Sequence, residues 1–482
     1  MKKLKINIKK AALLTCMSAL AFTAYSCSND MSELNVDPKH PTSMPSENLM
    51  ATGMYQGAYH TYSGSVAGNN FRFFIQQWTE TTYTDETNYN LVTRGQPQLF
   101  FNRMYTNTLN SYKTALESLQ KEGEVDADIK NNKFATIEIA SILIWENLVD
   151  TFGNIPYSQA LSPEKTKTPA YDDARTIYND LIARLDKASA MINTSKAGYG
   201  SADLIYSGNM AKWKKFANSL KLRLAINLAD VDPAASKAAA ESAINSGVLG
   251  SDSDSYKFTF TGGAFSNPLY DDLVASKRND FLPAERMVNS MNSANDPRRA
   301  KYFTPLANGT FSGGQYGTLN TYANYSHINP IWYPTDGNAK LFSYTEVLFL
   351  KAEAAARGFN AGDTAVNLYN MAIQSSMAEN GVTTADATAY LTANPYNAAS
   401  WKQSIGYQSY IALWNNPFAA WNFTRRLDYP VLPAPPASMV GGVPVRMPYS
   451  SNEYVVNETN VTAAGTAIGG DKATTKLFWD KN

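Results

Sequence analysis

The chain has 482 residues, with 42 basic and 42 acidic side chains, so its formal net charge is zero. Beyond the N-terminal segment there is no long basic run. The sequence therefore lacks the cluster of positive charge by which a protein binds nucleic acid. Two cysteines and three histidines are present, none with metal-ligand spacing such as H-E-x-x-H. We therefore predict no metal, no cofactor and no nucleic-acid partner.

The N-terminus has the pattern of an export signal. Five lysines among the first ten residues precede the apolar stretch 11–25, which is shorter than the roughly 20 residues that span a bilayer. Ala24-Tyr25-Ser26-Cys27 fits either ordinary signal peptidase cleavage or a lipobox with lipidated Cys27. Ala24 departs from the aliphatic residue that is usual in a lipobox. However, Cys27 is the only cysteine left after cleavage and has no disulfide partner in the chain, so we expect lipidation.

These features divide the chain into three predicted parts. Residues 1–26 form the lipoprotein signal peptide, 27–45 a lipid-anchored tether, and 46–482 a single α-helical domain. Removing the signal takes away five lysines and no acidic residue, which leaves 37 basic and 42 acidic side chains and a net charge of −5. A domain of this length can bury a large core.

Hydrophobic periodicity predicts three helix pairs. Their six helices cover residues 134–150, 171–192, 213–228, 232–244, 344–357 and 363–380. Asp173, Asp232 and Asp363 mark the start of the second helix in the three pairs. Gly247 and Gly381 mark the end of that helix in the last two pairs. Ala-rich pairs of about this length are typical of tetratricopeptide repeats. We expect a fourth pair as well.

The segments between the pairs are long and rich in Gly, Asn, Ser, Thr and aromatic residues. Residues 60–100 and 250–340 show no sustained period, apart from an alternating segment at 257–261 that predicts a short strand. Asp252-Ser253-Asp254 begins like a calcium loop but lacks the later Gly and Glu, so we interpret it as a turn. The Pro- and Gly-rich residues 430–448 predict an extended surface tail. The fold class is therefore mainly α, with tetratricopeptide-like helix pairs, long loop insertions and a few short strands.

Aromatic residues make up 12% of the chain, and the 29 tyrosines outnumber the 21 phenylalanines, which suits half-exposed surfaces. Two segments, 71–90 and 316–333, combine flat rings with polar side chains. Such a set can cover the C–H face and the hydroxyl rim of a sugar. From these segments we select the candidate ligand-binding residues Gln77, Trp78, Tyr83, Tyr89, Asn90, Tyr322 and Trp332. A position in the core fits Trp78 and the tyrosines that follow it equally well.

Several segments, taken together, resemble the SusD/RagB family, and their spacing is most similar to its shorter SusD-like branch. They are Asn35-Val36-Asp37-Pro38, residues 150–160 (DTFGNIPYSQA), Asn295-Asp296-Pro297-Arg298, residues 344–358, Trp421-Asn422-Phe423-Thr424-Arg425-Arg426, Tyr429-Pro430, Arg446 through Pro448-Tyr449, and Phe478-Trp479-Asp480. They occur in the family's order over essentially the whole chain after the signal.

The resemblance implies a nutrient-binding lipoprotein on the cell surface of a Bacteroidetes-type bacterium, held in the outer membrane by its lipid anchor. It further implies that the protein captures an oligosaccharide or an oligopeptide and delivers it to a SusC-like TonB-dependent transporter. The motifs are expected to be mostly structural: Glu346 and Glu353 share one helix face and are expected to pair with Arg425 or Arg426 in the core.

We expect no enzyme, but two alternatives to nutrient capture remain. A surface glycoside hydrolase requires two carboxylates about 5 to 10 Å apart across an aromatic groove. A structural transporter lid without ligand affinity of its own requires the aromatic segments to face the transporter.

Overall fold

The computed structural model describes residues 44–123 and 126–481. The predicted signal peptide, Cys27 and nearly all of the tether lie outside the described residues. The chain divides into two units, Met1–Met44 and Pro45–Asn482. Everything below concerns the second unit.

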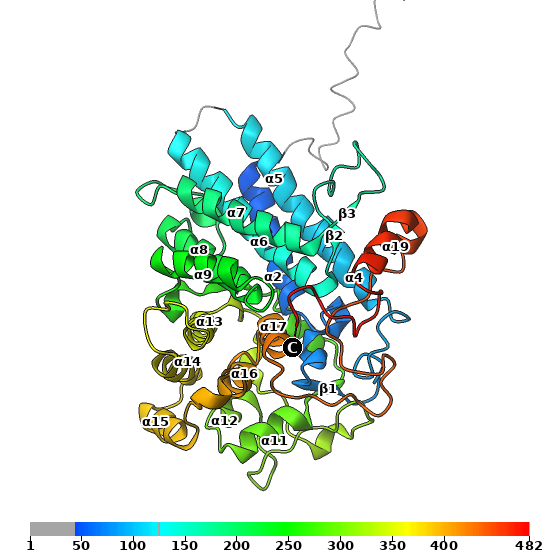
Figure 1. The fold of residues 1–482 in the computed structure, drawn as a ribbon. Coiled ribbons are helices and arrows are strands. Elements are labelled where there is room, and N and C mark those ends of the chain that lie inside the picture. Colours follow the sequence, from blue (N-terminus) through cyan, green and yellow to red (C-terminus); the bar gives the residue numbers. More distant parts are fainter. Residues whose placement is uncertain (1–43, 124–125, 482) are drawn as a thin grey trace, which may run out of the picture. The chain divides into compact units, whose positions relative to one another are not determined.

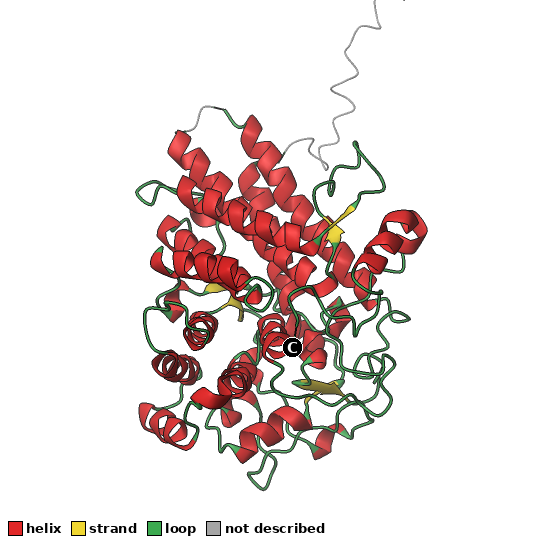
Figure 2. Ribbon diagram, in the orientation of Figure 1, coloured by secondary structure: helices red, strands yellow, loops and turns green. Residues whose placement is uncertain are grey.

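Helices dominate this unit, and its few strands are short (Figure 2). The α-helices are α2 (Ser46–Tyr62), α3 (Phe71–Phe74), α4 (Gln96–Asn102), α5 (Asn110–Lys121), α6 (Ala127–Phe152), α7 (Ala174–Met191), α8 (Met210–Asn227), α9 (Pro233–Asn245), α10 (Pro268–Tyr270), α11 (Glu285–Ser293), α12 (Arg299–Tyr302), α13 (Tyr344–Ala356), α14 (Ala365–Glu379), α15 (Thr384–Ala393), α16 (Trp401–Ala412), α17 (Pro417–Leu427), α18 (Glu453–Val456) and α19 (Glu458–Ala467). The strands form antiparallel pairs: β1 (Trp78–Glu80) with β5 (Phe281–Pro283), β2 (Ile155–Pro156) with β3 (Tyr171–Asp172), and β4 (Tyr256–Thr259) with β6 (Asn338–Phe342).

The three predicted helix pairs are confirmed as α6 with α7, α8 with α9, and α13 with α14 (Figure 1). Two further pairs pack in the same unit, α2 with α5 and α16 with α17, and they include the expected fourth pair. The fold class is therefore mainly α with tetratricopeptide-like pairs, as the sequence predicts.

Side-chain caps fix where half of the α-helices begin. Asp173 accepts a hydrogen bond from the backbone N–H of Thr176 at 2.9 Å, and Asp232 caps α9 in the same way. The cap of α14 differs from the prediction. Thr364, and not Asp363, accepts the backbone N–H of Asn367. Both residue types are good N-caps, so the sequence places the helix start within one residue.

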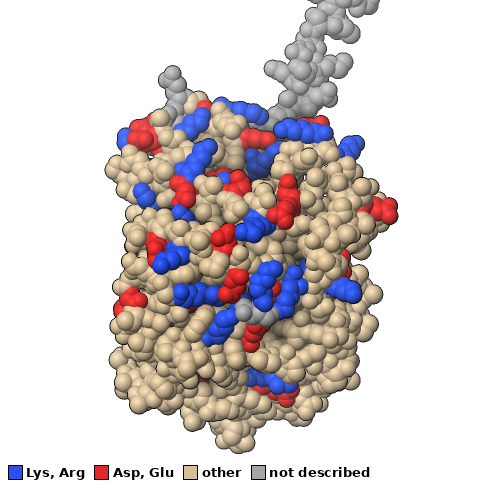
Figure 3. All heavy atoms as spheres, in the orientation of Figure 1, with Lys and Arg blue, Asp and Glu red and all other residues tan. Residues whose placement is uncertain are grey.

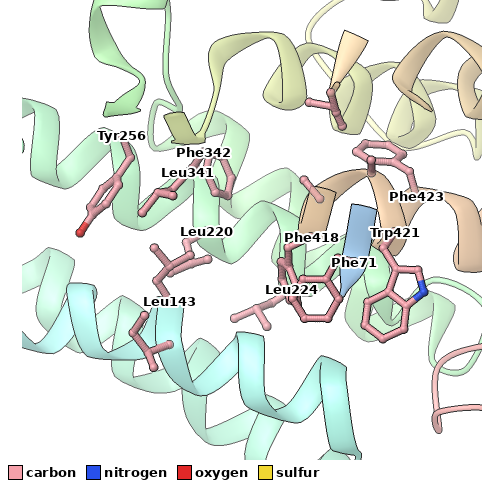
Figure 4. Close-up of a cluster of buried hydrophobic side chains, with 14 of the residues drawn as sticks. Phe71, Leu143, Leu220, Leu224, Tyr256, Leu341, Phe342, Phe418, Trp421 and Phe423 are labelled. Carbon is pink, nitrogen blue, oxygen red and sulfur yellow. The ribbon is translucent and has the colours of Figure 1, made fainter. Parts of the chain in front are cut away.

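One hydrophobic core joins the helix pairs to the short elements between them. Figure 4 shows a part of it in which the labelled side chains come from α3, α6, α8, β4, β6 and α17. Phe71 of α3 stacks on Trp421 of α17, with ring centroids 4.9 Å apart. The loop-rich segments are thus anchored by their own aromatic residues to the helical repeats.

Buried ion pairs connect the predicted motifs inside this core. Glu353 pairs with Arg426 at 2.8 Å, which confirms one of the expected pairings. The expectation for Glu346 is wrong: its partner is Arg223 of α8, at 3.0 Å. Arg425 instead donates to two backbone carbonyl oxygens. The seven-residue spacing of Glu346 and Glu353 predicts that both lie on one side of α13. It does not predict which neighbouring helix supplies the cation.

The loop segments contain more regular structure than their sequence predicts. Strand β4 confirms the alternating segment, and α3, α4 and α10 to α12 are short helices that the sequence analysis did not predict. Asp252 and Asp254 lie in a short 3-10 turn, where Asp252 accepts from the ammonium of Lys340 at 2.7 Å. Residues 430–448 form neither helix nor strand, and Arg446 near their end is fully buried.

Candidate ligand-binding site

The two predicted aromatic segments, although more than 200 residues apart in sequence, lie against each other. The backbone N–H of Asn320 donates to the carbonyl oxygen of Thr81 at 2.9 Å. Its side-chain amide donates to the carbonyl oxygen of Glu80 at 3.0 Å. Asn88 makes a matching bond to the carbonyl oxygen of Gly317 at 2.8 Å. The loop after β1 and the segment 314–320 therefore form one surface beside the β1–β5 pair.

Three of the seven candidate residues belong to the interior, which corrects their expected place in a ligand surface. Gln77, Trp78 and Tyr89 are each at most 1% exposed. The indole of Trp78 lies 5.7 Å from the ring of Phe281, and Gln77 donates to a backbone carbonyl oxygen. Burial raises the pKa of Tyr89 to about 12. These side chains are stabilised by the core and offer no face to a solute in this conformation.

Asn90 is half-buried and holds its own loop together. Its amide donates to the carboxylate of Asp85 at 2.9 Å, and its carbonyl oxygen accepts the hydroxyl of Thr93. Beneath the loop, Glu80 and Glu86 are both buried. Burial and the neighbouring Glu86 carboxyl raise the pKa of Glu80 well above its ordinary value. Glu80 accepts hydrogen bonds from the backbone N–H and the hydroxyl of Thr87, so this buried side chain also holds the loop.

Tyr83 is the most exposed of the candidates, at 54%. The guanidinium carbon of Arg278 lies 4.9 Å from the centre of its ring. Arg278 is itself held by Asp280 at 2.7 Å. The tyrosine ring is therefore positioned by a cation on one side, while much of it remains available to a ligand.

Tyr322 is half-buried and lies two residues from Asn320. Its ring stacks on the imidazole of His327 with centroids 3.9 Å apart. Burial and the nearby hydroxyl of Tyr333 raise the pKa of Tyr322 above its ordinary value. Half of this ring is therefore covered by its own segment, with His327 against one face.

Trp332 lines a pocket of about 320 Å³, which we call the Trp332 pocket. Its indole N–H donates to the carbonyl oxygen of Lys301 at 3.0 Å, and its ring lies against that of Tyr302. Four amide side chains share the lining, from β6, the end of α14 and the turn before α17: Asn338, Asn380, Asn415 and Asn416. A flat ring beside several amides is an arrangement that can bind a hydroxyl-rich, uncharged ligand.

Sequence reasoning missed these four asparagines. They are ordinary polar residues at the ends of separate elements, and no local spacing joins them to Trp332. The charged residues that line the pocket are all in ion pairs. Lys340 contacts Glu379 at 2.8 Å, and both Lys340 and Lys257 contact Asp252, which lies outside the lining, at 2.7 and 3.3 Å.

The amides also bond within the protein. Asn415 donates to the hydroxyl of Tyr62 and accepts from Arg72. Asn416 donates to the carbonyl oxygen of Leu341. The lining is therefore dipolar, with little uncompensated charge.

Within residues 44–481, apart from 124 and 125, no helix is both long and apolar enough to cross a membrane.

Comparisons with known proteins support one assignment. The SusD-like_2 family model, described as "Starch-binding associating with outer membrane", matches residues 38–450. A solved structure named as a chitin-binding protein is 25% identical with a TM-score of 0.80, and the match covers 91% of this chain and 100% of that one. A SusD homologue from Bacteroides uniformis ATCC 8492 is 27% identical with a TM-score of 0.80, covering 90% and 99%. A SusD-like protein from Bacteroides thetaiotaomicron VPI-5482 is 25% identical with a TM-score of 0.76, covering 91% and 99%.

No curated protein sequence matches the chain. The family model extends over most of the chain and includes the loop segments as well as the helix pairs. On this basis the protein belongs to the SusD-like family.

Proposed function

We propose that this protein is a cell-surface lipoprotein that captures a neutral oligosaccharide and delivers it to a SusC-like TonB-dependent transporter. The Trp332 pocket carries the proposal, because there a partly exposed indole lies among four amide side chains. Tyr83 and Tyr322 supply two further rings on the adjoining loops.

The chemistry of the pocket favours a sugar over a charged ligand. Sugar rings combine an apolar C–H face with a rim of hydroxyl groups, which match an aromatic ring and amides respectively. Figure 3 shows acidic and basic side chains interspersed over the upper part of one face, while its lower part carries few of either. The family description and the chitin-binding neighbour point to the same ligand class.

The proposed lipid anchor rests on the sequence around Cys27, and the proposed transporter partner rests on the family. Lipidation of Cys27 would place the described domain next to the outer membrane, with which the family is associated. The transporter would supply the energy for uptake, so this chain needs only to bind and release its ligand.

A hydrolase is not favoured by the Trp332 pocket. Glycoside hydrolysis uses a pair of carboxylic acids on opposite sides of the scissile bond. Among the described residues that line this pocket, Glu379 is the only acidic one. It accepts hydrogen bonds from Thr345 and Lys340, which suits a structural role.

The test is calorimetric titration of residues 28–482 with malto- and chito-oligosaccharides and, separately, with a peptide digest. We expect saturable binding to one oligosaccharide series, weakened at least tenfold by Trp332→Ala and several-fold by Tyr83→Ala. Trp401→Ala is the matched control, because Trp401 of α16 is also partly buried but lies outside the pocket. It should leave the affinity unchanged.

Binding to peptides alone would replace the glycan by an oligopeptide as the captured nutrient. Absence of binding to either class would favour the structural lid. Equal loss in Trp332→Ala and Trp401→Ala would show that the indole acts through stability and would remove the pocket from the proposal.

A further inference from the structure

A second and larger hollow lies between α5, α6, α7 and the loop after β2. Its volume is about 560 Å³, within the range of small-molecule sites. We call it the α5–α7 groove. In Figure 1, α5, α6 and α7 occupy the upper part of the view, whereas α14 and α16, which border the Trp332 pocket, lie at the lower left. The two hollows are therefore separate.

An aromatic corner forms one wall of the groove. The rings of Trp145 and Tyr157 are 4.9 Å apart and nearly perpendicular, at 78°. Trp145 is 7% exposed, so its ring is held by the core, while Tyr157 is half-buried at the rim. When two rings are nearly perpendicular, a flat ligand can stack on one of them. The other ring then limits how far the ligand can shift.

The Tyr157 ring is held rigidly in place. Its hydroxyl contacts the carboxylate of Asp180 and the guanidinium of Arg184. Arg184 is anchored in turn by Glu138 at 2.6 Å. A side chain with this many partners keeps one orientation, which lowers the entropy lost when a ligand packs against it.

The charged residues that line the groove balance one another. Two are cationic, Lys113 and Arg184, and two are anionic, Asp172 and Asp180. The side chains of Lys113 and Asp180 are 31% and 50% exposed, so both reach solvent. Carboxylates accept hydrogen bonds from hydroxyl groups and the cations donate to them, while the balance of charge favours no ionic ligand.

We propose that the α5–α7 groove is a second binding site for a neutral saccharide, separate from the Trp332 pocket. This inference rests on the proposed function, since it assigns the same ligand class to another part of the chain. A sugar ring packs its C–H face on Tyr157, and its hydroxyl groups reach Asp180, Asp172 and Lys113. Two sites on one chain hold one long glycan at two points, or two short ones independently.

Stoichiometry tests the proposal. Residues 28–482 are titrated with short malto- and chito-oligosaccharides, and the number of sites per chain is measured by calorimetry and equilibrium dialysis. We expect two sites in the wild type and one in Tyr157→Ala. Ser162→Trp should also leave one, because Ser162 lies in the loop that lines the groove and a large ring there fills the hollow without altering the core. Tyr396→Ala, which removes a half-buried tyrosine outside the groove, should retain two.

The outcomes separate this inference from the proposed function. One site in the wild type, retained in both groove variants and lost in Trp332→Ala, overturns the second site and leaves the proposed function intact. Two sites that are both unaffected by Tyr157→Ala and Ser162→Trp also overturn it. Absence of any oligosaccharide binding overturns the proposed function and the second site together. Unchanged melting temperatures for Ser162→Trp and Tyr396→Ala establish that the variants are folded.

Discussion

Trp78 and Tyr83 are five residues apart and equally plausible as ligand contacts from the sequence, yet they are 1% and 54% exposed. Trp78 opens β1, and its ring packs against those of Phe281 and Trp414 in the core. Tyr83 follows the strand in a loop that passes over the core. The two rings differ in whether residues distant in sequence pack over them. The local sequence around each ring does not specify this packing.

This contrast predicts opposite phenotypes for two alanine substitutions. Trp78→Ala should lower the free energy of unfolding by about 3–5 kcal/mol, because it leaves a cavity among packed aromatic rings. Tyr83→Ala should change it by less than about 1 kcal/mol, as is usual for exposed residues, while weakening oligosaccharide binding. Urea denaturation and calorimetry on both variants measure the two effects. A stable Trp78→Ala variant that has lost only binding would contradict the placement of Trp78.

His60 predicts a specific pH dependence. It is 5% exposed, and burial together with the charge of Arg103 lowers its pKa to about 3. In the unfolded chain the same imidazole takes up a proton near pH 6.5. The unfolded state thus binds more protons between these values. The stability that follows from keeping His60 neutral is present above pH 6.5 and is lost as the pH falls towards 3, by on the order of 5 kcal/mol.

His60→Gln removes this contribution. Free energies of unfolding, measured by urea denaturation from pH 7 down to pH 4, should fall less steeply in the variant than in the wild type. The carboxylates titrate in both proteins and cancel in the comparison. Parallel curves would mean that the pKa of His60 is the same in the folded and the unfolded protein.

At the scale of elements, one arginine links three helix pairs. Arg223 of α8 contacts Glu346 of α13 at 3.0 Å, and its Nε donates to Glu146 of α6 at 2.8 Å. All three side chains are buried. Each element contributes one charge to a network that exists only when the pairs are correctly stacked.

Arg223→Met should destabilise the protein by about 3–5 kcal/mol, since it leaves two buried carboxylates without their cation. The triple variant Arg223→Met, Glu146→Gln, Glu346→Gln should recover part of this loss, because it removes the uncompensated charges as well. Thermal and urea unfolding provide the comparison. If the single variant is as stable as the wild type, the network has no role in joining the pairs.

Asn320 has the corresponding role for the loops. Its side chain donates to the carbonyl oxygens of Glu80, Gln315 and Thr318, and its backbone N–H donates to that of Thr81. Asn320 thus supplies two of the hydrogen bonds between the loop after β1 and the segment 314–320, beside the bond from Asn88 to Gly317.

Asn320→Ala should increase hydrogen exchange in residues 81–95 and 314–325 by at least tenfold and weaken oligosaccharide binding several-fold. The global free energy of unfolding should change by no more than about 2 kcal/mol. Asn324→Ala is the control, because Asn324 is exposed in the same segment. Equal exchange in the two variants would show that other contacts hold the loops.

At the scale of the whole molecule, the attachment to the membrane remains a prediction, because Cys27 lies outside the described residues. Cys27→Ser should abolish incorporation of labelled fatty acid and move the protein from the outer-membrane fraction to a soluble one. Oligosaccharide affinity should stay unchanged, because the variant leaves the described domain intact. Continued fractionation with the membrane would point to ordinary signal cleavage and another means of attachment.

The sequence by itself determined the helix pairs, the caps Asp173 and Asp232, and the order of the family motifs. These properties are local: a 3.6-residue period and a capping aspartate act within one or two turns. For the same reason, the start of α14 was predicted to within one residue, and the strand β4 was predicted from five alternating residues.

Only the tertiary structure decided which aromatic rings face solvent, which cation pairs with Glu346, and which amides surround Trp332. The residues of the Trp332 pocket come from Tyr62 to Asn416, and their meeting depends on how the helix pairs stack. A periodic pattern identifies the apolar face of a helix, but many neighbours can cover that face equally well. The choice among them follows from packing across the whole core, where shape, charge and burial must be satisfied together.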